Sequence, residues 1–416
     1  MTKQRRAPVA WLVVAWAAAA LGCVEDESTT DVAASSSGAA MTTEGPPPDV
    51  APPLPFEGED ATFPKPVATS SARVKTSSCA PSLSHRKRID ARTSDALDRC
   101  EVLKTGLAKI SKQCGIGERR AKDMARFAAS VPALGDATIE RIRAVFERGK
   151  TLGRNPRVFG LVGDSITVSS DFLGSFSTKR DRKVATTAWV DQQLALTSGE
   201  SIIDFFRKGA AEKQNGVEVD PFACFRAAKV GARASWACEM EEAGKSPIVE
   251  LVERVNPAYA ILTFGANDAA YRASPPEAVA EEFDKHILAA VEALESRGVV
   301  VILSNEMRHG DQPGVKACPS DAPMNDWRVA VATNATSARA AEIACREQLP
   351  FIDLRHALDV ATNFGLGPDG VHLTTFQRGA GILDEEGLDC GNNIRNLVSL
   401  IALKRVVDAL VAAPPR

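Results

Sequence analysis

Four short apolar runs lie between amphipathic segments from about residue 157 onward, and they narrow the choice of fold most. None shows the polar alternation of a half-exposed strand, as expected for strands buried on both faces of a parallel sheet. Helical periodicity between the runs is clearest at 275–297, where Ser274 and Glu277 form a capping box and Gly298 ends the helix. This alternation predicts a three-layer α/β/α sandwich. The runs are 157–162, 258–264, 299–303 and 350–354, and a further strand is predicted near 223–228.

The N-terminus has the layout of an export signal. A basic stretch is followed by an apolar stretch, 7–21, which is too short to span a membrane comfortably. Ala20-Leu21-Gly22-Cys23 resembles a bacterial lipobox, so 1–23 is predicted to be a signal peptide and Cys23 to be lipidated. A plain secretory signal is the alternative. The predicted product is an exported, membrane-anchored lipoprotein, periplasmic or on the cell surface, that contacts the membrane only through its lipid.

The remaining chain divides into three segments that differ in composition. The segment 24–74 is rich in Ser, Thr and Pro and is expected to be a disordered linker, because it holds too little apolar surface to offset its ordering entropy. Residues 75–150 are predicted to form a small helical extension, in which Asp136 caps a helix that Gly149 ends. Residues 151–416 form the predicted main domain. The net charge of -3 indicates no nucleic-acid partner.

The chain has nine cysteines, and eight remain when Cys23 is set aside. An even number suits disulfides in an exported protein. Disulfides between cysteines that are close in the sequence are the simplest prediction. The alternative is that several cysteines stay as buried thiols. Because no Cys-x-x-Cys pair occurs, a zinc or redox site is not expected, and no metal is predicted. The predicted local pairs are Cys224 with Cys238 and Cys318 with Cys345.

Two tracts supply the parts of a nucleophilic mechanism. Gly163-Asp164-Ser165 follows the first strand run, and a loop about two hundred residues later carries Asp369 and His372. A serine hydroxyl needs a base to take its proton, and a histidine can do this near neutral pH. A carboxylate fixes the tautomer of that histidine. Taken singly, Ser165 could merely cap a helix and Asp369 could belong to a turn.

Two further tracts supply donors for an oxyanion. Gly231 and Asn267 each follow a predicted strand. The backbone N–H groups of Ser165 and Gly231 and the side-chain amide of Asn267 are the predicted oxyanion hole.

The four tracts, in this order, resemble the SGNH hydrolases, also called the GDSL esterase/lipase superfamily. The residues that name the family fall on Ser165, Gly231, Asn267 and His372, with Asp369 as the third member of the triad. The resemblance covers roughly 155–412. It implies a flavodoxin-like parallel sheet, no cofactor, and cleavage of small esters, acetylated sugars or lipids.

The expected function is a monomeric serine esterase that hydrolyses short-acyl esters, among them acetylated glycans, through an acyl-enzyme. Arg233, Arg272 and Arg308 follow strand ends and indicate a polar or anionic substrate. Two alternatives remain open. An O-acyltransferase would use the same triad, and a surface-displayed binding lipoprotein would not use it at all.

Overall fold

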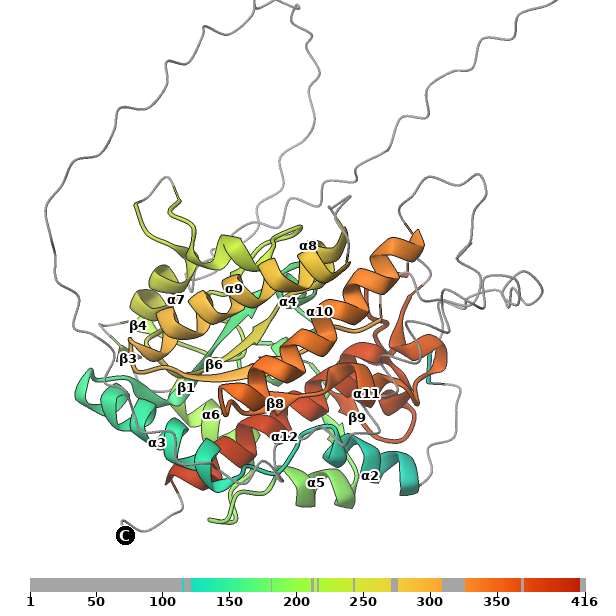
Figure 1. Ribbon diagram of the computed structural model, residues 1–416. Helices are drawn as coiled ribbons and strands as arrows, with labels where there is room; N and C mark the ends of the chain where they lie inside the picture. The colour runs from blue at the N-terminus through green and yellow to red at the C-terminus, as the bar shows by residue number, and fades with distance from the viewer. Residues whose placement is uncertain are drawn as a thin grey trace, which may run out of the picture. The chain divides into compact units, whose positions relative to one another are not determined.

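A five-stranded parallel sheet lies at the centre of the protein, as the computed structural model shows (Figure 1). Its spatial order is β5-β1-β6-β7-β8, which becomes 2-1-3-4-5 when the strands are counted along the chain. That is the order of flavodoxin-like sheets. The predicted sheet is therefore confirmed. Its strands are β1 (Asn155–Gly163), β5 (Ala227–Ala228), β6 (Pro257–Thr263), β7 (Val300–Ser304) and β8 (Phe351–Ile352).

The structure describes residues 114–115, 121–180, 182–210, 213–214, 217–241, 244–270, 276–308, 326–367 and 370–411. The predicted signal peptide 1–23 with Cys23, the predicted linker 24–74 and most of the helical extension lie outside these residues. Asp369, Ser274, Arg272 and Cys318 lie outside them as well.

Side chains of each central strand alternate between two cores. Phe159 and Leu161 of β1 belong to one core, whereas Val158 and Val162 belong to the other. The strands β6 and β7 alternate in the same way, because successive side chains of a strand point to opposite faces. All seven residues of β6 are buried, which is why its sequence shows no polar alternation.

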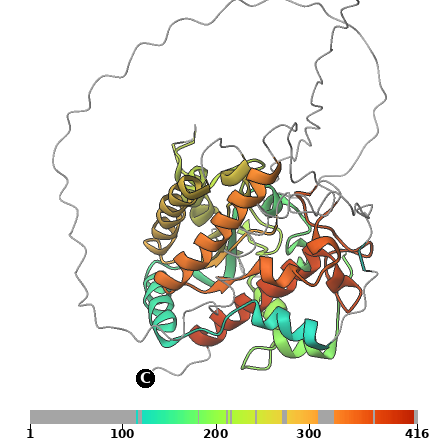
Figure 2. The same cartoon turned by 45° about the vertical axis from the view of Figure 1, so that its right-hand side comes forward.

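Helices cover both faces of the sheet, so the three layers predicted from the sequence are confirmed (Figures 1 and 2). One face packs against α2 (Ala121–Ala129), α3 (Asp136–Thr151), α5 (Ala188–Leu194), α6 (Ile202–Ala210), α11 (Leu354–Leu358) and α12 (Gly391–Val411). The other face packs against α7 (Pro247–Val255), α9 (Pro276–Glu295) and α10 (Asp326–Arg346).

The remaining elements are short. The turns after β1 and β6 hold α4 (Ser165–Val168) and α8 (Ala266–Ala270). A two-residue parallel pair joins β2 (Ala185–Thr186) to β9 (Ile382–Leu383), and an antiparallel pair joins β3 (Lys213–Gln214) to β4 (Val217–Glu218). The 3₁₀ turns are η2 (Gly174–Phe176), η3 (Ala234–Cys238), η4 (Thr362–Gly365) and η5 (Gly387–Asp389).

The ends of α3 differ from the prediction. Gly135, not Asp136, is the N-cap residue, and it has no side chain to cap the helix. The helix also continues through Gly149 to Thr151. Gly149 is needed for another reason: a Cβ atom there would overlap the backbone of Gly298, where α9 leads into β7. The close approach of two backbones, not a helix end, therefore explains this glycine.

The cysteine pairing also differs from the prediction. A disulfide joins Cys114 to Cys390, 276 residues apart, and ties the segment before α2 to the start of α12. The predicted pair Cys224–Cys238 is wrong, because both residues carry thiols. Cys345 carries a thiol as well, and its predicted partner is outside the described residues. Proximity in sequence was a poor guide here, since the fold brings distant segments together.

Among the described residues, no helix combines the length and the hydrophobicity needed to cross a bilayer. The same residues contain no cluster of His, Cys, Asp and Glu that could bind a metal ion.

Candidate active site

Three adjacent strands bring three of the predicted site residues to one edge of the sheet. Gly163, at the end of β1, pairs with Ala228 of β5 on one side and with Thr263 of β6 on the other. Ser165, Gly231 and Asn267 follow these three strand ends. The chain passes from β1 to β5 on one side and then to β6 on the other, so the strand order reverses between β1 and β6. Ligands bind at such a switch point in open parallel sheets.

The turn that carries Ser165 is tight and well defined. Asp164 is the N-cap residue of α4, and its Oδ1 accepts a hydrogen bond from the Ile166 N–H at 3.2 Å. A Cβ atom at Gly163 would overlap the Thr167 hydroxyl, so the glycine is required at this position. Ser165 itself is partly exposed, as a nucleophile that must meet substrate has to be. The capping role considered for Ser165 belongs to its neighbour Asp164.

Asn267 contacts the serine turn directly. Its side-chain Nδ2 donates a hydrogen bond to Asp164 Oδ2 at 3.0 Å. The two oxygens of Asp164 therefore hold two parts of the site, α4 and Asn267. Because a side-chain amide carries two N–H groups, this bond fixes the orientation of Asn267 and leaves a second donor on the same nitrogen.

Gly231 adopts a left-handed backbone conformation, with φ of 75°. This conformation favours glycine strongly. Its loop is held at both ends: the Lys229 N–H donates to the Gly163 carbonyl of β1 at 3.2 Å, and the Ala234 N–H donates to both carboxyl oxygens of Asp268 in α8 at 3.2 Å. Because Asp268 is next to Asn267 in the sequence, its carboxyl group connects the loop of Gly231 to the helix that carries Asn267.

His372 lies on a loop that packs beside residues 165–173, the serine segment. Its side chain is exposed, and its carbonyl accepts a hydrogen bond from the Gly367 N–H at 2.8 Å. Three residues later, the Thr375 hydroxyl donates to Asp171 Oδ2 at 2.7 Å, just after α4. The structure thus brings the two loops together, but in the described part of the chain no hydrogen bond joins Ser165 to His372. Apo enzymes often form this bond only when substrate is present.

Asparagines at the start of α12 connect the histidine loop to the serine segment. Asn392 Nδ2 donates to the Leu373 carbonyl at 3.2 Å and to the Thr375 hydroxyl at 3.0 Å. Asn396 accepts from the Leu173 N–H at 2.8 Å and donates to the Asp171 carbonyl at 2.9 Å. Sequence analysis did not identify this structural role.

Two arginines donate to the carbonyls of the serine segment. The fully buried Arg395 of α12 donates to the Ile166 carbonyl at 2.6 Å and to the Thr167 hydroxyl at 3.1 Å. Arg226 donates to the carbonyls of Thr167 and Ser169 at 2.7 and 2.6 Å. Burial lowers the pKa of each arginine to about 10, so both stay charged near neutral pH. Charge-assisted bonds of this kind hold residues 163–169, the nucleophile turn, in place.

Three acidic residues close to the site are buried. Burial raises the pKa of Asp164 to about 6, although Arg395 and the Ile166 N–H oppose the rise. Burial likewise raises the pKa of Asp268 to about 6. Glu306 lies two residues after β7, and its pKa is well above the usual range, again mainly because of burial. Sequence analysis did not identify Glu306, since one acidic residue after an apolar run carries no distinguishing signal.

The raised pKa of Asp268 predicts a pH-dependent cost to stability. The folded state holds the proton up to about pH 6, whereas the unfolded chain releases it near 3.8. The proton therefore stabilises the fold most below pH 4, and the contribution is lost as pH rises through 6. Asp268→Asn should gain up to about 3 kcal/mol of unfolding free energy relative to wild type between pH 4 and pH 7. Denaturant titrations at both values measure this change, and a difference that does not vary with pH would contradict it.

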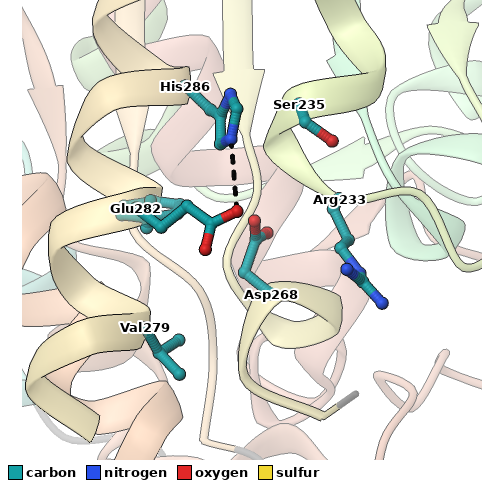
Figure 3. Close-up of a pocket in the computed structure, with 7 residues that line it drawn as sticks. Arg233, Ser235, Asp268, Val279, Glu282 and His286 are labelled. Atoms are coloured by element: carbon teal, nitrogen blue, oxygen red, sulfur yellow. Dashed lines mark ion pairs between the residues drawn. The ribbon is translucent and has the colours of Figure 1, made fainter. Parts of the chain in front are cut away.

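A pocket opens beside Asp268, between η3 and α9 (Figure 3). Five of the seven residues that line it are polar, and His286 Nε2 lies 3.6 Å from Glu282 Oε1. The lining residues are Arg233, Ser235, Asp268, Val279, Glu282, Phe283 and His286. Of the three arginines expected to meet substrate, Arg233 reaches this pocket.

Arg308 has a structural role instead. It is buried, donates to Asp359 Oδ1 at 2.6 Å and lies 4.1 Å from the centre of the Phe364 ring. The expectation that Arg308 meets an anionic substrate is therefore not supported.

Comparison with known proteins agrees with this geometry. The model of the GDSL-like Lipase/Acylhydrolase family matches residues 161–376, just over half of the 416-residue chain, and includes all five predicted site residues. No curated protein sequence matches the chain.

Three solved structures illustrate the structural likeness. An acylhydrolase from Bacteroides fragilis is 17% identical, with a TM-score of 0.32, covering 63% of this chain and 95% of its own. A GDSL-like lipase from Bacteroides thetaiotaomicron is 15% identical, with a TM-score of 0.30, covering 57% and 90%. A lipase/acylhydrolase from Enterococcus faecalis is 20% identical, with a TM-score of 0.30, covering 59% and 92%. TM-scores of this size establish nothing about function, so the assignment depends on the family match. The chain belongs to the GDSL-like lipase/acylhydrolase family and is a hydrolase that acts on small-molecule esters.

Proposed function

We propose that the protein is a serine esterase that cleaves short-acyl esters through an acyl-enzyme. Ser165 Oγ attacks the ester carbonyl while His372 takes its proton. The tetrahedral intermediate then expels the alcohol, which receives that proton from His372. Water attacks acyl-Ser165 in the second half-reaction, with His372 again as base, and the acid is released. Asp369 orients His372 throughout.

The oxyanion of each tetrahedral intermediate needs donors that are in place before reaction. The proposed donors are the N–H groups of Ser165 and Gly231 and the second N–H of the Asn267 amide. These three residues follow the ends of three neighbouring strands, and this observation supports the proposal most strongly. The bond from Asn267 to Asp164 supports it further, because it holds the amide beside the nucleophile turn.

Arg233 lines a small pocket beside Asp268, the residue that follows Asn267, and this cationic side chain supports a polar alcohol part for the ester, such as a glycan hydroxyl. A charged, hydrogen-bonding side chain near the site suits sugar hydroxyls better than an alkyl chain. We therefore infer that the acyl group is short, with acetate as the first candidate.

A panel of esters tests this function. For p-nitrophenyl esters, kcat/KM should be at least about tenfold higher for acetate than for octanoate, since about 1–3 kcal/mol of discrimination is ordinary for a pocket of limited size. Acetylated polysaccharides should release acetate when the purified protein is added. Preference for the octanoyl ester, with no acetate release from any glycan, would refute the short-acyl assignment.

A further inference from the structure

Glu306 is a buried acidic residue to which the proposed mechanism assigns no role. It follows β7 at the same edge of the sheet as the serine turn, and its exposed fraction is 1%. The charged groups that act on its pKa come from three elements: Asp164 from the turn between β1 and α4, Asp268 from α8, and Arg395 from α12. Its carboxyl group thus interacts with two groups that hold the turn around Ser165, Asp164 and Arg395.

The hydrogen bonds around Glu306 indicate a shared proton. Among the described residues, no N–H or O–H group donates to either oxygen of its carboxyl group. A hydrogen bond between the carboxyl groups of Glu306 and Asp164 is one cause of the raised pKa of Glu306. Two ionised carboxylates cannot bond to each other, and a buried ion with no donor costs several kcal/mol. One of the two must therefore carry a proton.

The surroundings place that proton on Glu306. Asp164 already accepts hydrogen bonds from the Ile166 N–H and from Asn267, and Arg395 also favours its charged form. Arg395 favours the charged form of Glu306 as well, but no N–H or O–H group of the described residues donates a hydrogen bond to the Glu306 carboxyl. Burial and the charge of Asp164 hold its pKa well above the usual range.

We propose that Glu306 is a positioning residue for the esterase: as a neutral carboxylic acid it donates a hydrogen bond to Asp164, which keeps Asp164 oriented toward α4 and Asn267. The inference rests on the proposed function, since positioning matters only if Ser165 and Asn267 act on substrate. Glu306 acts through Asp164 and does not touch the reacting atoms.

The expected consequence falls on kcat. Without a donor from Glu306, the Asp164 carboxylate gains freedom to rotate away from Asn267, and the oxyanion donor loses its alignment. Such an interaction is made in the transition state and not in the ground state, so its loss lowers kcat and leaves KM nearly unchanged.

Two variants of similar size separate hydrogen bonding from packing. Glu306→Gln keeps a donor, in the form of an amide N–H, whereas Glu306→Met has none. We expect the Gln variant to retain kcat within about threefold and the Met variant to lose roughly 10- to 100-fold, a modest share of what loss of an oxyanion donor costs. KM should change by less than about twofold in both. Equal kcat values for two folded variants, whether high or low, would overturn the proposal.

Infrared spectroscopy tests the protonation state without relying on the Met variant to fold. The wild-type minus Glu306→Gln difference spectrum at pH 8 should contain the C=O stretch of a protonated carboxylic acid. A difference spectrum with carboxylate bands alone would overturn the proposal.

A Ser165→Ala control separates this inference from the proposed function. If Ser165→Ala kept wild-type activity, the proposed function would fail, whatever the Glu306 variants did. If Ser165→Ala were inactive while the Gln and Met variants matched each other, only the role of Glu306 would fail.

Discussion

Replacing Ser165 by alanine is expected to lower kcat for p-nitrophenyl acetate by roughly 10⁴- to 10⁶-fold, because the nucleophile of an acyl-enzyme mechanism cannot be substituted by a neighbour. KM should stay within a few-fold of wild type, since the pocket and the oxyanion donors remain. Thermal unfolding should change little, as the Ser165 side chain is partly exposed and the cap of α4 is supplied by Asp164.

Ser296→Ala is a matched control for this experiment. Ser296 lies between α9 and β7, at the opposite end of the strands, and its hydroxyl donates to the Ala293 carbonyl. Its activity should remain within about twofold of wild type, the outcome usual for a surface substitution away from the site. A Ser165→Ala protein that hydrolyses the ester as fast as this control would rule out Ser165 as nucleophile.

Replacing His372 by alanine is the second large effect. Loss of the general base should lower kcat/KM by roughly 10²- to 10⁴-fold. Because the His372 side chain is exposed, its removal leaves a space open to solvent, and added imidazole should restore part of the activity. Initial rates with and without imidazole at constant pH and ionic strength measure this rescue.

His356→Gln serves as the control for loss of a histidine. His356 lies on α11, where its Nδ1 is 3.3 Å from Arg126 and 4.0 Å from Asp359, and glutamine retains a polar side chain there. It should keep nearly full activity. Equal losses in both histidine variants, without imidazole rescue of His372→Ala, would show that instability and not loss of a base explains the result.

The layers and the order of the sheet could be predicted because each buried strand has an apolar run of its own. The runs at 258–264 and 299–303 match β6 and β7 closely, since burial on both faces permits few polar residues. β5 was harder to place. It has only two residues, Ala227 and Ala228, so its length carries almost no signal. The disulfide Cys114–Cys390 could not be predicted either, because pairing over 276 residues depends on the folded chain.

The location of a predicted site residue could be inferred where it closely follows a strand, while its catalytic role stays a prediction. Ser165, Gly231 and Asn267 lie at one edge for that reason, whereas the contact of Asp369 with His372 stays a prediction. The supporting residues could not be predicted. Arg395 lies in a long helix whose apolar residues indicate only burial, and Glu306 is one acidic residue among many. Their roles follow from tertiary contacts with α4 and Asp164.

Covalent labelling of the native protein with a fluorophosphonate tests the nucleophile most directly. The reagent reacts with an activated serine, and peptide mass spectrometry locates the adduct. We predict one adduct, on Ser165, and none on folded Ser165→Ala. An adduct on another residue, or wild-type protein that stays unlabelled while it hydrolyses esters, would contradict the account.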